Sequence, residues 1–189
     1  MKKIVFAVLI TIIFSCKNEE KKAQENIQDG VTQEDDTKNI QDSKPKDLTK
    51  LLYESFEEGK EINKTLGGLY SMTKASVIID PDSDDNIYIS FLLGREIIEE
   101  EFKDYELQLN VFPYAEEVSL LREDTKKKDR DYDSWYFKPK IASVNGVSFL
   151  YKKLDTPISD FRQIYVHLYD VNTKKIIQES IVIKNLELQ

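Results

Sequence analysis

Three aspartates alternate along one short stretch and could bind a metal ion. In "DPDSDDN", Asp80, Asp82 and Asp84 stand at every second position, as do the first ligands of a calcium-binding loop. Asp85, however, stands where such a loop needs glycine, and Phe91 stands where it needs a bidentate glutamate. The stretch therefore predicts at most a weak Ca²⁺ site at Asp80, Asp82 and Asp84, and no other cofactor. The alternative is a hairpin turn built from residues that favour turns.

A second candidate site lies in "QIYVHLYD", where Tyr165, His167 and Tyr169 recur at every second residue. In a strand this period places the three side chains on one face. The opposite face would take the aliphatic residues Ile164, Val166 and Leu168. Aromatic side chains with a polar tip are enriched at binding surfaces. We expect Tyr165, His167 and Tyr169 to form part of a ligand face; the alternatives are that a helix covers this face or that it is an ordinary tyrosine-rich sheet surface.

The sequence contains no motif that names a reaction. His167 is the only histidine and Cys16 the only cysteine, so clusters of zinc-binding residues and a paired catalytic thiol are not expected. There is no nucleophile motif around a serine and no glycine-rich phosphate loop. We therefore expect no enzymatic activity, although a hydrolase that uses a carboxylate pair stays open because acidic residues are abundant.

Cys16 itself has a different chemistry, set by the residues before it. Two lysines precede the apolar run "IVFAVLITIIF", which is followed by Ser15 and Cys16. This order is typical of a secretory signal, and the run is too short to span a bilayer as a helix. The end of the run, "IFSC", resembles the lipobox of bacterial lipoproteins. The resemblance implies that residues 1–15 are a signal peptide, that Cys16 becomes the mature N-terminus, and that its thiol carries lipid, with palmitate among the acyl chains.

Residues 16–45 then follow as a polar stretch with no aromatic residue. Such a composition cannot bury enough apolar surface to fold, which predicts a disordered, charged tether. "KNEE" at residues 17–20 resembles the short charged export signals of surface lipoproteins in some Gram-negative bacteria, and the alternative is the ordinary charged start of a tether. We expect an outer-membrane protein held by lipid, either surface-exposed or facing the periplasm.

Residues 46–189 have the length of one globular domain. The pattern over 48–56 predicts a helix, with Asp47 at its start and either Gly59 or Gly67–Gly68 at its end. Beyond it, alternating apolar runs separated by turn signals predict about seven strands. The expected fold is mainly β: an antiparallel β-sandwich, immunoglobulin-like or related, with one N-terminal helix. The charged stretch at 122–133 is expected to be a mobile loop.

These features together predict a binding or interaction module on a lipid anchor, with an unidentified protein or glycan as its ligand. The net charge of −8 argues against nucleic acid as a partner. A structural or assembly accessory that faces the periplasm is the alternative, with the carboxylate-pair hydrolase as the third.

Overall fold

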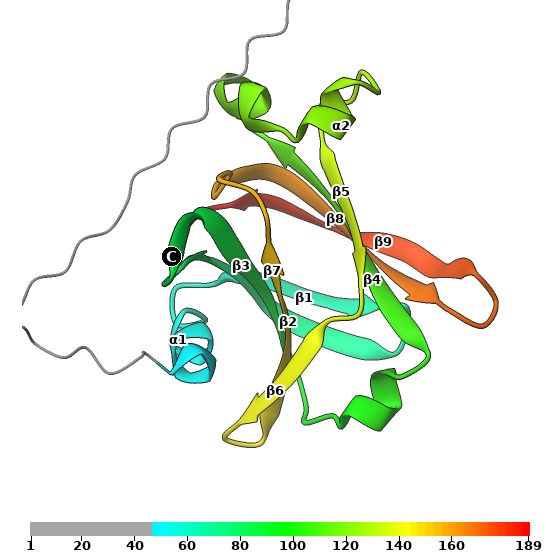
Figure 1. The fold of residues 1–189 in the computed structure, drawn as a ribbon. Helices are drawn as coiled ribbons and strands as arrows, with labels where there is room; N and C mark the ends of the chain where they lie inside the picture. The colour runs from blue at the N-terminus through cyan, green and yellow to red at the C-terminus, as the bar shows by residue number, and fades with distance from the viewer. Residues whose placement is uncertain (1–46) are drawn as a thin grey trace, which may run out of the picture. The chain divides into compact units, whose positions relative to one another are not determined.

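Alternating apolar residues build two antiparallel sheets that pack face to face, as Figure 1 shows. The structure is a computed structural model, and it describes residues 47–189. Sheet A has the strand order β1-β2-β3-β7-β6, and sheet B has the order β5-β4-β8-β9. The strands are β1 (Lys60–Leu66), β2 (Tyr70–Asp80), β3 (Ser83–Leu93), β4 (Tyr105–Pro113), β5 (Asp133–Phe137), β6 (Lys140–Val144), β7 (Val147–Leu154), β8 (Phe161–Asp170) and β9 (Lys175–Leu186). The prediction of a mainly β, antiparallel sandwich is confirmed, while an immunoglobulin-like arrangement in particular stays a prediction.

The core lies between the two sheets and is filled by the inward residues of each strand. Leu107, Leu109 and Val111 of β4 are fully buried, as their alternation requires. They share one apolar cluster with Ile89 and Phe91 of β3 in the other sheet. The inner faces of sheets A and B are thus fully used by the core, which leaves the two outer faces for other purposes.

Helix α1 (Leu48–Glu54) covers part of the outer face of sheet A. Its N-terminus is capped by Asp47, whose carboxylate accepts a hydrogen bond from the backbone N–H of Thr49 at 3.0 Å. Leu52 of the helix and Phe56 just after it are buried against Ile78 and Phe149 of sheet A. The helix therefore packs on the sheet that does not contain β8.

The helix ends earlier than its apolar spacing predicts, and the predicted stop at Gly67–Gly68 is wrong. Residues after Gly59 form β1, a strand that the sequence pattern did not indicate. Gly67 and Gly68 instead make the turn between β1 and β2, with φ of +57° and +71°, values that glycine adopts without strain.

The stretch 134–144 reads as one strand in the sequence but forms two. β5 belongs to sheet B and β6 belongs to sheet A, so the chain crosses between the sheets at Lys138–Pro139. Proline has no N–H to donate to a sheet, which makes Pro139 a natural place for pairing to stop.

The charged stretch 122–133 also differs from the expected loop. It contains the short helix α2 (Glu123–Lys126), followed by a turn, and is tied to the sandwich at Asp133. The buried carboxylate of Asp133 accepts a hydrogen bond from the Thr125 hydroxyl at 2.5 Å and one from the backbone N–H of Arg122 at 3.3 Å. The segment is therefore held in place by its own polar contacts.

Several predictions concern residues outside the described range: the signal peptide at 1–15, lipidation at Cys16 and the tether at 16–45.

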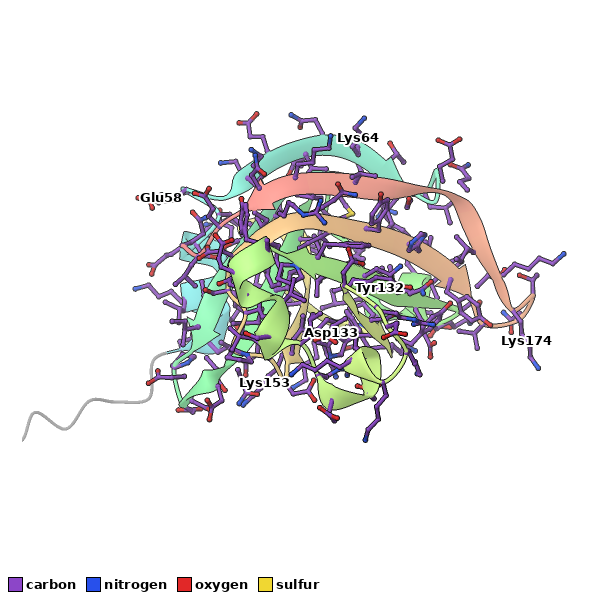
Figure 2. The ribbon with its side chains drawn as sticks, turned by 90° about the horizontal axis from the view of Figure 1, so that it is seen from above. Glu58, Lys64, Tyr132, Asp133, Lys153 and Lys174 are labelled. Atoms are coloured by element: carbon purple, nitrogen blue, oxygen red, sulfur yellow. The ribbon has the colours of Figure 1, made fainter. Side chains whose placement is uncertain are left out.

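Two short 3-10 helices flank β4: η1 (Glu99–Phe102) precedes it, and η2 (Ala115–Leu120) follows it. Within residues 47–189, no helix has the length and apolar character that crossing a membrane would require. Figure 2 shows Lys174 at the tip of the β8–β9 hairpin, at the end of the sandwich away from Glu58.

Candidate ligand-binding face

Strand β8 places the three predicted site residues together on the outer side of sheet B. Ile164, Val166 and Leu168 are fully buried in the core. Because successive side chains point to opposite faces, the side chains of β8 that alternate with them point away from the core and are half-buried: Tyr165, His167 and Tyr169. Helix α1 does not cover them, since it packs on sheet A. The expected orientation of the three residues is therefore confirmed, while their role as a ligand face stays a prediction.

Neighbouring strands extend this surface. Across β4, Asn110 lies opposite Tyr165, and Gln108 lies opposite His167. Gln108 also lies opposite Tyr136 of β5. We call the whole surface the aromatic face and define it by the outward side chains of sheet B: Glu106, Gln108, Asn110, Phe112, Ser134, Tyr136, Gln163, Tyr165, His167, Tyr169, Ile176, Val182 and Lys184.

Ring contacts order the aromatic residues of the face. The rings of Tyr136 and Tyr169 meet edge to face, with centroids 5.1 Å apart and planes at 85°. Those of Tyr165 and His167 are nearly parallel, with centroids 6.4 Å apart. Phe112 packs against Tyr165 at 5.5 Å. Such contacts fix the rings without covering them, and Tyr136 keeps half of its surface exposed.

The centre of the face carries no charge near neutral pH. Burial lowers the pKa of His167 below its usual value of 6.5, so the imidazole is neutral at pH 7. Burial, and to a lesser degree Tyr169 and Glu106, raises the pKa of Tyr136 above 10.0. The phenol therefore stays protonated and can both donate and accept a hydrogen bond.

Most polar groups of the face are free to meet a ligand. Asn110 Oδ1 accepts a hydrogen bond from the Ser134 hydroxyl at 2.8 Å. Among residues 47–189, the side chains of Gln108, Tyr136 and Tyr165 make no hydrogen bond to another protein group. The amides were missed as site residues in the sequence, although the alternation of "YELQLNVF" already separates Gln108 and Asn110 from the core positions.

The predicted calcium ligands are not brought together. Asp80 is buried and paired with the ammonium group of Lys153, which is the main reason that its pKa is lowered. Its other oxygen accepts the backbone N–H of Asp82 at 3.2 Å. Asp82 and Asp84 are more exposed, in and beside the β2–β3 turn. Over the described part of the chain, no group of three or more His, Cys, Asp or Glu residues is arranged to hold a metal ion.

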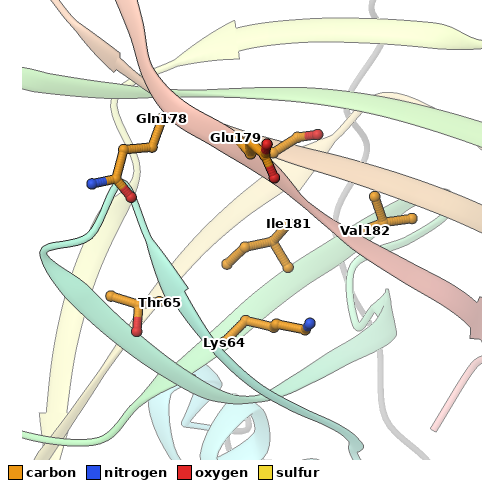
Figure 3. Close-up of a pocket in the computed structure, with 7 residues that line it drawn as sticks. Lys64, Thr65, Gln178, Glu179, Ile181 and Val182 are labelled. Carbon is orange, nitrogen blue, oxygen red and sulfur yellow. The ribbon is translucent and has the colours of Figure 1, made fainter.

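A groove runs between β1 and β9, the edge strands of the two sheets, and Figure 3 shows it in close-up. Its volume is about 640 Å³, and it is lined by residues 64–65 and 178–182. Lys64 and Glu179 bring opposite charges to it. Both strands are irregular here: the register of β1 shifts between Glu61 and Lys64, and Gln178 has a φ of +56°. Bulged edges of this kind discourage pairing with another strand.

A second hollow, at Tyr114 beside η2, is acidic. Its volume is about 520 Å³, and its carboxylates are Glu116, Glu117, Asp160 and Glu187. Burial, and then the nearby carboxylate of Asp160, raises the pKa of Glu117 above its usual range. One oxygen of Glu117 is buried and accepts no hydrogen bond from the described residues. A carboxyl group with a raised pKa beside other carboxyl groups is an arrangement that acid–base chemistry uses.

Comparison with known proteins adds no relative: no family model, no curated protein and no solved structure matches this chain. The fold and the site therefore define only a class, an antiparallel β-sandwich with one helix-covered face and one open aromatic face.

Proposed function

We propose that this chain is a lipid-anchored envelope protein that displays a β-sandwich binding module, with the aromatic face as its ligand surface. The observation that carries the proposal is the contrast between the outer faces of the two sheets. Helix α1 buries the part of the outer face of sheet A around Ile78 and Phe149, whereas no helix among residues 47–189 covers the half-buried rings and amides of sheet B. Tyrosines supply contact area with little loss of rotamer freedom, which favours binding as the use of this face.

The place where the chain enters the sandwich supports the proposal. Asp47 and α1 lie on the outer side of sheet A, which is the side opposite the aromatic face. An anchor that precedes Asp47 in the sequence would join the module from the side that needs no access. The resemblance of residues 13–16 to a lipobox supplies that anchor, with Cys16 as the acylated residue and the outer membrane as the location. Two or three acyl chains on one residue hold a protein firmly at a membrane.

The anchor is tested by Cys16→Ser. The thioether to lipid cannot form on serine, so the variant should remain unprocessed or soluble and should take up no labelled palmitate. Ser15→Ala, which keeps Cys16 and a small residue before it, serves as the control and should still be labelled. A Cys16→Ser protein that is cleaved, labelled and found in membranes would contradict lipidation.

The ligand face is tested by replacing two of its tyrosines. Tyr165→Ser combined with Tyr169→Ser should abolish capture of ligand from an envelope extract and lower the melting temperature by only a few degrees, because both side chains are half-buried. The matched control replaces Tyr88 and Tyr151, a tyrosine pair on the outer face of sheet A, and should leave capture unchanged. Undiminished capture by the Tyr165/Tyr169 variant, or its failure to fold, would count against the proposal.

The acidic hollow favours a hydrolase as the second candidate function. Glu117 would be the proton donor, because its pKa is raised, and Asp160 would be the second carboxylate of the pair. Hydrolysis of a chromogenic aryl glycoside that disappears in Glu117→Gln and persists in Glu116→Gln would favour this activity over binding alone.

A further inference from the structure

We infer that the ligand of the aromatic face is an uncharged glycan. This inference rests on the proposed function, since it names the chemical class that the same face would bind. A sugar ring presents C–H groups on its faces and hydroxyl groups around its edge. A surface that recognises it needs flat apolar rings together with neutral groups that both donate and accept hydrogen bonds.

The register of sheet B provides both kinds of group side by side. In one row across the strands, the amide of Gln108 lies between the rings of Tyr136 and His167. In the next row, Asn110 lies between Ser134 and Tyr165. Each amide offers two donor hydrogens and an acceptor oxygen. Each amide thus lies beside at least one aromatic ring, and a saccharide presents C–H faces to rings and hydroxyl groups to amides.

Charge complementarity supports an uncharged ligand. The chain as a whole carries a net charge of −8, which repels anionic polymers. His167 is kept neutral by its lowered pKa, and burial raises the pKa of the Tyr136 phenol. Glu106, opposite Tyr169, is the acidic group of the face. The rows of Gln108 and Asn110 therefore contain no cation that could hold a phosphate, sulfate or uronate; the cations near the face, Lys184 and Arg162, lie at its Phe112 end.

The central position of Gln108 favours a glycan over a protein partner. A protein surface that covered the face would have to satisfy this amide while excluding water, and an unsatisfied buried polar group costs about 1–3 kcal/mol. Sugar hydroxyls can rotate to donate to or accept from the amide. The side chains with aliphatic character, Ile176 and Val182, lie on the edge strand β9 and not at the centre of the face.

The experiment uses the full-length chain, purified in detergent and immobilised, with an envelope extract of the cells that produce it as the probe. One portion of the extract is left untreated, one is oxidised with periodate, which cleaves the vicinal diols of sugars, and one is digested with proteinase. Retained carbohydrate is measured after washing. The expected result is equal retention from the untreated and digested portions and about a tenfold or greater loss after oxidation.

Two variants connect the result to the face. Gln108→Ala should lower retention by about tenfold, the effect of losing about 1.4 kcal/mol of binding free energy. Gln189→Ala removes an exposed amide elsewhere and should have no effect. Capture that proteinase abolishes, or that resists periodate, would overturn the glycan and leave the proposed binding function intact. If the untreated extract gives no capture, or if Tyr165→Ser with Tyr169→Ser leaves it unchanged, the proposed function falls and the glycan inference falls with it.

Discussion

The outer faces of sheets A and B contain similar residues but differ in their cover: α1 packs on sheet A, and no helix in the described part of the chain packs on the aromatic face of sheet B. Edge-to-face aromatic pairs occur on both: Phe56 with Phe149 at 5.6 Å on sheet A, and Tyr136 with Tyr169 at 5.1 Å on sheet B. The first pair is buried beneath α1, while Tyr136 is half exposed. Ring contacts alone therefore do not distinguish a core from a binding surface. The distinction is whether another element, such as α1, packs over the rings.

Polar side chains on the two faces also differ in whether they have a partner within the protein. On sheet A, Asp80 is paired with Lys153, and the Ser76 hydroxyl donates a hydrogen bond to that of Ser55, next to α1, at 2.7 Å. On sheet B, the amide of Gln108 has no partner among the described residues. Ser76 and Asp80 are thus satisfied within the protein, whereas the open amide of Gln108 is available to a ligand.

The largest expected effect concerns the covered face. Phe149→Ala should lower the free energy of unfolding by about 3–5 kcal/mol, because it leaves a cavity beneath α1. Tyr136→Ala on the open face should lower it by less than about 1 kcal/mol. Urea unfolding of both variants measures the difference. Equal losses would show that the two faces are not distinct in their contribution to stability.

A smaller effect is expected at the ion pair of sheet A. Lys153→Met leaves the buried Asp80 carboxylate without its cation, so the melting temperature should fall, though by less than in Phe149→Ala. The pair lowers the folded-state pKa of Asp80 below 3.8. Its stabilisation is therefore present above pH 3.8 and is lost as the pH falls through the folded-state pKa. Between pH 7 and pH 2, the melting temperature of the variant should decrease less than that of the wild type. An identical pH dependence of the two proteins would contradict this role. Lys152→Met, which alters the neighbouring lysine, is the control.

The smallest effect is expected at His167 on the open face. Burial lowers its folded-state pKa below 6.5, so the unfolded chain binds more protons just below pH 6.5. Stability should consequently decrease as the pH falls through this range, and His167→Gln should remove that decrease. Differential scanning calorimetry at pH 7.5 and pH 5.5 tests it. A variant that keeps the full decrease would place its origin at another group.

Local patterns predicted the regular strands well. The alternation in β4 and β8 fixes which side chains are buried, and the orientation of Tyr165, His167 and Tyr169 followed directly from it. β1 was missed because "KEINKTL" has only two large apolar residues. A bulged edge strand needs few, since much of its surface meets solvent.

The non-local features could not be predicted in the same way. Which sheet the helix covers depends on the packing of Leu52 and Phe56 against Ile78 and Phe149, residues far apart in the sequence. Tyr136 joins Tyr169 only through the pairing of β5 and β8 with β4. The ligand face is thus a product of register, and no single segment of the sequence contains it.

The edge position of β1 has a mechanical consequence. A pulling force that enters through the N-terminal side of the module acts first on α1 and then on Lys60, the residue that begins the β1–β2 pairing opposite Ala75. Because the load reaches this hairpin at one end, its residue pairs separate one after another and not all at once. The elements that carry this load, α1, β1 and β2, do not belong to sheet B. We therefore expect the N-terminal elements to extend before the strands of sheet B separate, although β1 also contacts β8 and β9.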